Sequence, residues 1–146
     1  MSQDLPLAGL KVIDCASFIA APVATTVLAD FGADVIKIEP PSGEPYRRDD
    51  PAMRVPYSEY PYNYIVDNRS KRGITLDLKI DAGRKVLHKM LESADVFVTN
   101  APFPARKRLQ VRYEDFKELY PRLIYASVTA YGEQGPEADR TGFDST

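Results

Sequence analysis

The stretch Leu10–Glu39, LKVIDCASFIAAPVATTVLADFGADVIKIE, decides the fold. Its two ends, Leu10–Asp14 and Asp34–Ile38, are short runs rich in Val and Ile, as buried strands are. Between them a helix is predicted over 22–31, because proline suits the first helical position and Gly32 suits the left-handed residue after the last turn. A strand, a helix and a strand in this order predict a βαβ unit with parallel strands.

The rest of the chain continues the alternation of strand and helix. Three further strands are predicted at Ile74–Leu78, Asp95–Thr99 and Leu123–Val128. Two further helices are predicted, one over 82–93 with Asp81 as its N-cap, and a short one over 114–119. The chain is therefore predicted to be an α/β protein with a Rossmann-like open parallel sheet and flanking helices.

The helix predicted over 82–93 has one apolar stripe that would face the core. The stripe consists of Val86, Leu87, Met90, Leu91 and Ala94. His88 is the only histidine and lies off this stripe, so we expect a solvated surface residue and not a catalytic one.

A Pro- and Tyr-rich insertion, about residues 40–64, separates the second and third predicted strands. It holds six of the 12 prolines, and four of the nine tyrosines fall between Tyr57 and Tyr64. An insertion of this length is often a functional loop or an interaction arm, but its tyrosines could equally pack on their own domain. The sequence leaves both interpretations open, and it does not distinguish a lid from an arm that reaches a partner protomer.

Composition restricts the classes of function. With 44% hydrophobic and 27% charged side chains, 146 residues suffice for one domain. The net charge of −2 argues against nucleic acid or acidic membranes as partners. No apolar run approaches the roughly 18 residues of a membrane span, so a cytoplasmic protein is expected. A single cysteine, Cys15, and a single histidine make an internal disulfide, a His/Cys metal site or a histidine-dependent triad improbable.

In an open parallel sheet, ligands bind at the carboxyl ends of the strands. Basic residues follow two of the predicted strands: Lys79 after the third, and the run Arg106–Arg108 after the fourth. Arg69, Lys71 and Arg72 approach from the other end of the third strand. Together these residues suggest a ligand with several phosphates, although charge runs are often only solvated loops.

A dinucleotide cofactor is a weaker alternative. Glu39 stands where an acid would bind ribose hydroxyls, but the first strand is followed by CASFIAAPVA, which lacks the glycines of G-x-G-x-x-G. No P-loop sequence is present either. An NAD-dependent oxidoreductase is therefore disfavoured.

Five stretches, in order, resemble the class III coenzyme A transferases, the family of formyl-CoA transferase, which also includes acyl-CoA racemases. They are LAGLKVIDCASFIAAPVATTVLADFGADVIKIEPPSGEPYR (7–47), NRSKRGITLDLK (68–79), ADVFVTNAPFPARKRLQV (94–111), LYPRLIYASVTAYGEQGP (119–136) and GFDST (142–146). The resemblance implies that residues 1–146 are an amino-terminal half-domain that binds coenzyme A (CoA). It also implies that the remainder of the protein follows residue 146, and that the full-length protein is an interlocked homodimer.

The resemblance also implies which residues contact CoA or acyl-CoA, here a substrate, with no metal required. These residues are Ile19, Ala20, Leu76, Asp77, Leu78, Lys79, Asn100, Ala101, Pro102, Arg108, Thr141, Gly142, Phe143 and Asp144. The same strand ends are selected by the sheet geometry.

The chain departs from the family pattern at three positions. Ile19 replaces a glutamine of formyl-CoA transferase, which indicates a different substrate or hydrogen-bond donor. Pro40 stands where a basic residue contacts the 3′-phosphate side of CoA, and Arg47 or Arg48 is a candidate to replace it. Phe143 stands where the racemases have a proton-transferring histidine, which disfavours racemisation.

The family's transfer chemistry uses an aspartate as the nucleophile. It lies downstream of the GFD stretch, so the resemblance implies a nucleophilic aspartate beyond Thr146. Asp144 matches a binding-loop position, so no catalytic residue is assigned within 1–146, and we expect this fragment alone to be inactive.

The function expected is CoA transfer between carboxylic acids, through an aspartyl mixed anhydride and an enzyme–CoA thioester. The alternatives are an acyl-CoA racemase or lyase-like relative, and a non-catalytic CoA-binding module or subunit of a split enzyme.

Overall fold

A five-stranded parallel sheet forms the centre of the structure, a computed structural model that describes residues 5–47 and 58–142. The strands are β1 (Lys11–Asp14), β2 (Asp34–Glu39), β3 (Arg72–Thr75), β4 (Val96–Thr99) and β5 (Ile124–Ser127). They lie side by side in the order β3-β2-β1-β4-β5, and every neighbouring pair is parallel. The predicted parallel α/β sheet is confirmed.

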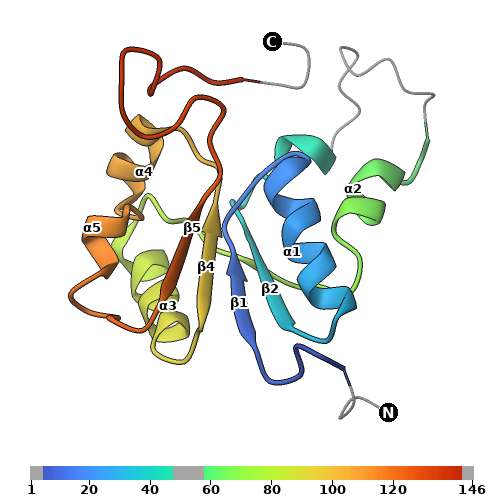
Figure 1. Cartoon of the computed structure of the whole chain (residues 1–146). Helices are drawn as coiled ribbons and strands as arrows, with labels where there is room; N and C mark the ends of the chain where they lie inside the picture. Colours follow the sequence, from blue (N-terminus) through green and yellow to red (C-terminus); the bar gives the residue numbers. More distant parts are fainter. Residues whose placement is uncertain (1–4, 48–57, 143–146) are drawn as a thin grey trace.

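Helices cover both faces of the sheet (Figure 1). They are α1 (Ala20–Asp30), the 3-10 turn η1 (Pro45–Arg47), α2 (Tyr62–Asp67), α3 (Asp81–Leu91), α4 (Phe103–Leu109) and α5 (Tyr113–Phe116). The helices α1 and α2 lie on one side of the sheet, and α3, α4 and α5 lie on the other. Crossovers of one hand produce this division, because the chain builds the sheet outward from β1 first in one direction and then in the other.

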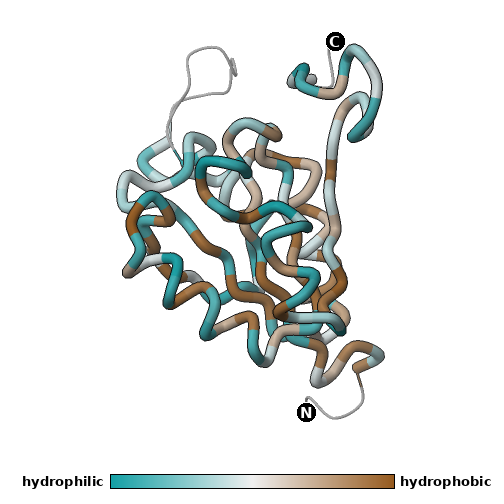
Figure 2. The backbone as a smooth tube through the Cα atoms, turned by 90° about the vertical axis from the view of Figure 1, so that its left-hand side faces the viewer, coloured by the Kyte–Doolittle hydropathy of each residue, from teal (hydrophilic) through white to brown (hydrophobic). Residues whose placement is uncertain are grey.

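Two apolar clusters, one on each face, hold the layers together. Val12 points to the α1 side and Ile13 to the α3 side, as alternate strand residues must. Phe97 is fully buried on the α3 side, where its ring packs edge-on against Phe116 of α5. Figure 2, seen from that side, shows brown hydrophobic stretches in the strands and alternating teal and brown along the helices.

The third strand begins two residues and ends three residues earlier than predicted, at Arg72–Thr75 and not at Ile74–Leu78. Its partner β2 ends at Glu39, whose carbonyl accepts the last interstrand hydrogen bond, from the Leu76 amide (2.9 Å). The chain then turns, and Leu78 is buried in the cluster on the α3 side. The apolar alternation of ITLDL therefore reflects a buried turn residue and not a longer strand.

The helix boundaries differ from the predictions in small ways. The first helix begins at Ala20, so Pro22 is its third residue, where no backbone N–H is needed. Gly32 has a φ of 103° and follows the C-cap, as predicted. The second predicted helix includes Asp81 and has Ile80 as its N-cap, and the short helix predicted over 114–119 covers only Tyr113–Phe116.

Two expectations about α3 were wrong. Val86 is 41% exposed and does not belong to the buried stripe. His88 is half-buried, and its Nδ1 lies 2.8 Å from the hydroxyl of Tyr120. Because Tyr120 is brought beside α3 by the turn that precedes β5, helical spacing alone gave no sign of this contact.

The helix α4 is not among the helices predicted from the sequence. Pro104 stands in its first turn, where proline is tolerated. The helix ends at Gln110, which has a left-handed φ of 57°. A helix of seven residues carries too short a periodic signal to be distinguished from a loop.

Candidate functional site at the carboxyl ends of the strands

The point at which the strand order reverses lies between β1 and β4, and open α/β sheets bind ligands there. The turn after β1 and the segment after β4 are joined by Asn100. Its Oδ1 accepts a hydrogen bond from the Ser17 amide (2.9 Å), and its Nδ2 donates one to the Ser17 carbonyl (2.7 Å). Asn100, predicted as a CoA contact, thus uses both polar atoms of its side chain to hold the neighbouring turn.

The turn that leads into α1, residues 15–19, has an unusual backbone. Phe18 has a φ of 62°, a left-handed conformation that is unfavourable for a bulky side chain. Two residues earlier, both backbone polar groups of Ala16 form hydrogen bonds. Its amide donates to Asp14 Oδ1 (3.1 Å), and its carbonyl accepts from Lys37 Nζ (2.8 Å). Beyond the turn, Ile19 and Ala20 are exposed at the N-terminus of α1.

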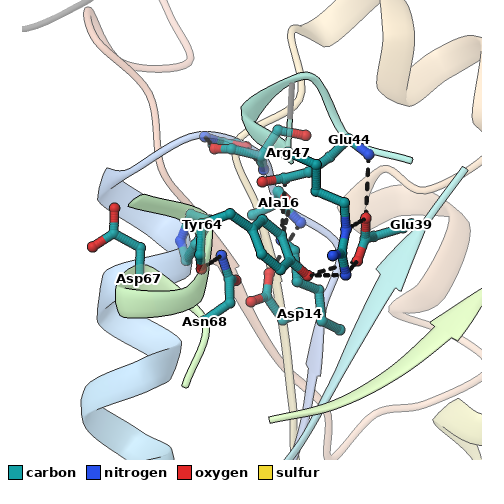
Figure 3. Close-up of polar contacts among 12 residues, drawn as sticks. Asp14, Ala16, Glu39, Glu44, Arg47, Tyr64, Asp67 and Asn68 are labelled. Atoms are coloured by element: carbon teal, nitrogen blue, oxygen red, sulfur yellow. Dashed lines mark hydrogen bonds and ion pairs between the residues drawn. The ribbon is translucent and has the colours of Figure 1, made fainter. Parts of the chain in front are cut away.

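Below this turn is a buried polar network (Figure 3). Lys71 Nζ lies 2.8 Å from Asp14 Oδ2, and the two side chains are 2% and 0% exposed. The same ammonium group donates to Asn68 Oδ1 (2.8 Å) and to the carbonyl of Pro22 in α1 (2.7 Å). Burial lowers the pKa of Lys71, and the Asp14 carboxylate opposes that change. The network joins β1, α1 and the segment before β3.

A second buried ion pair joins β2 to the loop that follows it. Lys37 Nζ lies 3.2 Å from Glu44 Oε2, and each side chain is 1% exposed. Among the described residues no group donates a hydrogen bond to either oxygen of Glu44. Burial raises the pKa of Glu44, partly offset by the charge of Lys37.

The carboxylate of Glu39, at the end of β2, is hydrogen-bonded by two residues of the insertion. Arg47 donates to both of its carboxylate oxygens (2.6 and 2.7 Å), and the Tyr64 hydroxyl donates to Oε1 (2.6 Å). The Arg47 guanidinium lies over the Tyr64 ring, 3.7 Å from its centre. The sequence suggested that Glu39 could bind a ribose and that Arg47 could bind a phosphate, but in the structure these two side chains bind each other. Arg48, the other candidate for the phosphate, lies outside the described residues.

The tyrosines of the insertion divide into two groups. Tyr46 and Tyr64 are buried against their own domain, and the Tyr46 hydroxyl donates to Asp67 (3.0 Å). Tyr60 and Tyr62 are exposed. Tyr57 lies outside the described residues. The packing of Tyr46 and Tyr64 agrees with the second interpretation for these two residues, while a functional loop or interaction arm stays a prediction.

We expect the stability that Glu39 contributes to depend on pH. Burial alone raises the pKa of Glu39, but the hydrogen bonds from Arg47, Tyr64 and the Glu44 amide outweigh it and lower the pKa from 4.5 to about 2. A carboxylate whose pKa is lower in the folded state stabilises the fold at pH values above its pKa in the unfolded state. This stabilisation is lost as the pH falls toward the pKa in the folded state. Glu39→Gln should therefore lower the free energy of unfolding by about 3 kcal/mol at pH 7 and by progressively less between pH 5 and 2.

The measurement for this prediction is urea unfolding of both proteins across that pH range. Asp34→Asn is the control, because Asp34 pairs with Arg72 on the surface and should contribute about 0–1 kcal/mol. A difference between wild type and Glu39→Gln that stays constant down to pH 2 would contradict the assignment of the shift to Glu39.

The basic cluster predicted at the sheet edge is smaller than expected. Arg106 is 2% exposed and donates to the Ala101 carbonyl (2.5 Å) and the Ser127 hydroxyl (2.6 Å). Arg69 and Arg72 form ion pairs with Asp30 and Asp34, and Lys71 is buried as described above. Sequence charge alone did not reveal these partners. Of the basic residues predicted for this cluster at the carboxyl edge, Lys79, Lys107 and Arg108 are exposed.

The remaining predicted contact residues are also placed by the structure. Leu76 and Asp77 are half-buried, Leu78 is buried, and the Asp77 carboxylate accepts the Lys79 amide (3.0 Å). Ala101 is half-buried and Pro102 is exposed at the N-cap of α4. Thr141 and Gly142 end the described part of the segment after β5, which runs above the upper edge of the sheet (Figure 1).

The last four residues of the sequence, 143–146, lie outside the described residues. They include Phe143 and Asp144, which the family resemblance assigns to the CoA site, and Thr146, beyond which it implies the nucleophilic aspartate. The structure therefore does not test these three assignments, and they stay predictions.

The cysteine at this edge is unsuited to nucleophilic chemistry. Burial raises the pKa of Cys15 to about 12, so its thiol stays protonated at neutral pH. Within residues 5–47 and 58–142, no three His, Cys, Asp or Glu side chains gather where a metal ion could bind. In the same part of the chain, none of the helices has the length and apolar character that a bilayer span requires.

Comparison with known proteins identifies the family. The model of CoA-transferase family III matches residues 7–146. The chain belongs to this family. A cinnamoyl-CoA:phenyllactate CoA-transferase of Clostridium sporogenes is 47% identical over 139 residues, which are 94% of this chain and 34% of that protein. An (R)-2-hydroxy-4-methylpentanoate CoA-transferase of Clostridioides difficile is 41% identical over 142 residues, covering 96% of this chain and 35% of that protein.

The family member's fold is shared with solved structures. A CAIB/BAIF family protein from Brucella suis superposes with a TM-score of 0.87 at 37% identity, over 98% of this chain and 38% of that one. The chain thus spans about a third of the length of the relatives it matches.

Sequence reasoning missed the buried polar network of this CoA-transferase family III chain. Two signals for it were present: a lysine, Lys37, inside the otherwise apolar strand DVIKIE, and an aspartate, Asp14, at the end of LKVID. A buried strand carries a charge only when a partner is close. Lys71 lies 57 residues from Asp14 along the chain, and Glu44 reaches Lys37 through the fold of the loop after β2, so the sequence identifies neither partner.

Proposed function

We propose that the chain is the CoA-binding half-domain of an enzyme that transfers CoA between carboxylic acids. The observation that carries the proposal is the match of the CoA-transferase family III model over residues 7–146. The described residues support a phosphate-bearing ligand at the carboxyl edge, where Lys79 and Arg108 are exposed.

The proposed CoA contacts follow from this position. Ile19, Ala20 and the segment 100–102 border the point at which the strand order reverses. Segment 76–79 and Arg108 bring a backbone turn and two cations to the same edge. Thr141, Gly142, Phe143 and Asp144 are proposed to complete the site from the segment after β5.

The chemistry proposed is covalent transfer through a carboxylate. An aspartate beyond Thr146 attacks the thioester carbonyl of the donor; the C–S bond breaks, CoA leaves as the thiolate, and a mixed anhydride forms. The thiolate then attacks the aspartyl carbonyl and releases the donor acid, leaving an enzyme thioester. The acceptor carboxylate attacks this thioester, the C–S bond breaks, and a second mixed anhydride forms as the CoA thiolate leaves. The thiolate then attacks the acceptor acyl carbon of this anhydride, which gives the acceptor–CoA thioester and releases the aspartate. On this scheme residues 1–146 bind CoA but do not react alone. We also propose that the whole protein is an interlocked homodimer in the cytoplasm.

The acceptor to be tested first is a 2-hydroxy carboxylic acid. The two relatives described above are named for phenyllactate and for 2-hydroxy-4-methylpentanoate, both of which are 2-hydroxy acids. The apolar side chains of Phe18 and Ile19, in the turn before α1, suit such acids better than a second carboxylate. Release of a 2-hydroxyacyl-CoA by the protein containing this chain, followed by mass spectrometry, tests the choice.

Arg108→Ala should weaken CoA binding. A charge-assisted contact to phosphate contributes about 1.5–3 kcal/mol, so the dissociation constant should rise about 10- to 150-fold. Isothermal titration of the chain with CoA measures it. Arg122→Ala is the matched control, because Arg122 is exposed just before β5, at the opposite end of the strands. Equal affinities of wild type and Arg108→Ala would remove Arg108 from the site.

A separate measurement tests the racemase alternative. Exchange of deuterium at the α-carbon of an acyl-CoA by the full-length protein would favour a racemase over a transferase.

A further inference from the structure

The turn over residues 15–19 lies at the centre of the proposed CoA site and is held from outside itself. Asn100 fixes Ser17, while Ala16 is fixed by Asp14 at its amide and by Lys37 at its carbonyl. Local geometry works against this turn, because Phe18 is held in the left-handed region at a φ of 62°. The turn therefore depends on these contacts for its conformation.

Lys37 is the member of this set that also reaches another loop. It stands in β2, where the strand neighbours are apolar, and its side chain is 1% exposed. Its ammonium group has two partners, the Ala16 carbonyl (2.8 Å) and the Glu44 carboxylate (3.2 Å). One side chain thus joins the turn after β1 to the loop after β2.

The Glu44 side of this connection is itself fixed by the insertion. The Glu44 amide donates to Glu39 Oε2 (3.2 Å), and Glu39 is held by Arg47 and Tyr64. No group in the described part of the chain donates a hydrogen bond to the side-chain oxygens of Glu44, and Lys37 is the cation 3.2 Å from its carboxylate. The ion pair therefore connects the insertion to the turn.

We propose that Lys37, paired with Glu44, is a positioning residue that sets the turn over 15–19, and with it Ile19 and Ala20, for CoA binding. The choice of CoA as the ligand rests on the proposed function, whereas the contacts of Lys37 with the turn and with Glu44 do not. The bond from Lys37 to the Ala16 carbonyl is the contact that connects the ion pair to the turn. Deleting both charges distinguishes this positioning role from a purely structural one.

The variant for the test is the double substitution Lys37→Met/Glu44→Met. Lys37→Met alone would leave Glu44 as a buried, unpaired carboxylate, whereas replacement of a whole buried pair by apolar residues is often nearly neutral for stability. In the double variant the fold is kept while the Ala16 carbonyl loses its donor. Leu91→Ala is the control, because it weakens the core on the α3 side, on the sheet face away from α1.

The first measurement is amide hydrogen exchange at Ala16 and Ser17 without ligand, and the second is CoA affinity. We expect the double variant to exchange at least about tenfold faster at these two amides and to bind CoA about tenfold or more weakly, whereas Leu91→Ala leaves their exchange relative to the other core amides unchanged. Unchanged exchange, or faster exchange with unchanged CoA affinity, overturns the positioning role. The positioning role is also overturned if Leu91→Ala speeds exchange at Ala16 and Ser17, relative to the other core amides, as much as the double variant does.

Failure of the proposed function gives a different result. If the wild-type chain does not bind CoA, the CoA site is wrong, and exchange at Ala16 and Ser17 still decides whether Lys37 holds the turn.

Discussion

Lys71→Met should lower the free energy of unfolding by about 3–5 kcal/mol. The substitution leaves Asp14, which is 0% exposed, without the cation that lies 2.8 Å from it. It also removes the donor to Asn68 and to the Pro22 carbonyl, so α1 and the segment before β3 lose a common partner. Urea unfolding followed by circular dichroism measures the loss.

The neighbouring arginine supplies the control. Arg72 pairs with Asp34 at the surface, where the two side chains are 65% and 46% exposed, so Arg72→Ala should cost no more than about 1 kcal/mol. Both variants remove one positive charge from adjacent positions. A Lys71→Met protein as stable as Arg72→Ala would show that the buried pair contributes little beyond its surface counterpart.

Gly83→Ala should destabilise the protein by about 3 kcal/mol, although the position is helical. In an open helix, alanine is more favourable than glycine by about 0.5–1 kcal/mol. At this position a Cβ atom would lie 2.1 Å from the carbonyl oxygen and 2.7 Å from the carbonyl carbon of Asp77. Because both atoms belong to the backbone, the clash cannot be relieved by rotating a side chain.

The same clash should displace segment 76–79, so we also expect weaker CoA binding if that segment contacts the ligand as proposed. Gly73→Ala in β3 is the control, because nothing lies within 4 Å of a Cβ added there. It should leave stability unchanged or raise it slightly. Thermal unfolding of both variants is the measurement, and a higher melting temperature for Gly83→Ala would contradict the close approach of α3 to the Asp77 turn.

The order and type of the main elements could be predicted, because the evidence for them is local. Strands such as DVIKIE and VFVT are short β-branched runs, and the helix between the first two strands has Gly32 at its end. Boundaries were less certain where tertiary contacts end an element. The third strand stops at Thr75 because its partner ends, which ITLDL does not indicate.

The candidate site was predictable in position but not in detail. Parallel strands bring their carboxyl ends to one edge, so the segments after β1, β3 and β4 were selected correctly as segments of that edge. The state of each side chain there was not predictable. Arg106 and Arg108 are two residues apart in one basic run, yet the first is buried against Ala101 and Ser127 and the second is exposed.

The sequence by itself determined the parallel α/β sheet, the edge at which we propose that a ligand binds and the resemblance to a CoA transferase, since each depends on periodicity or on residues close along the chain. Only the tertiary structure decided which charges are free and which are paired. Asp14 with Lys71 and Glu39 with Arg47 and Tyr64 show the reason. A charge in a buried strand needs a partner within a few ångströms, and that partner comes from whichever distant segment the fold brings there.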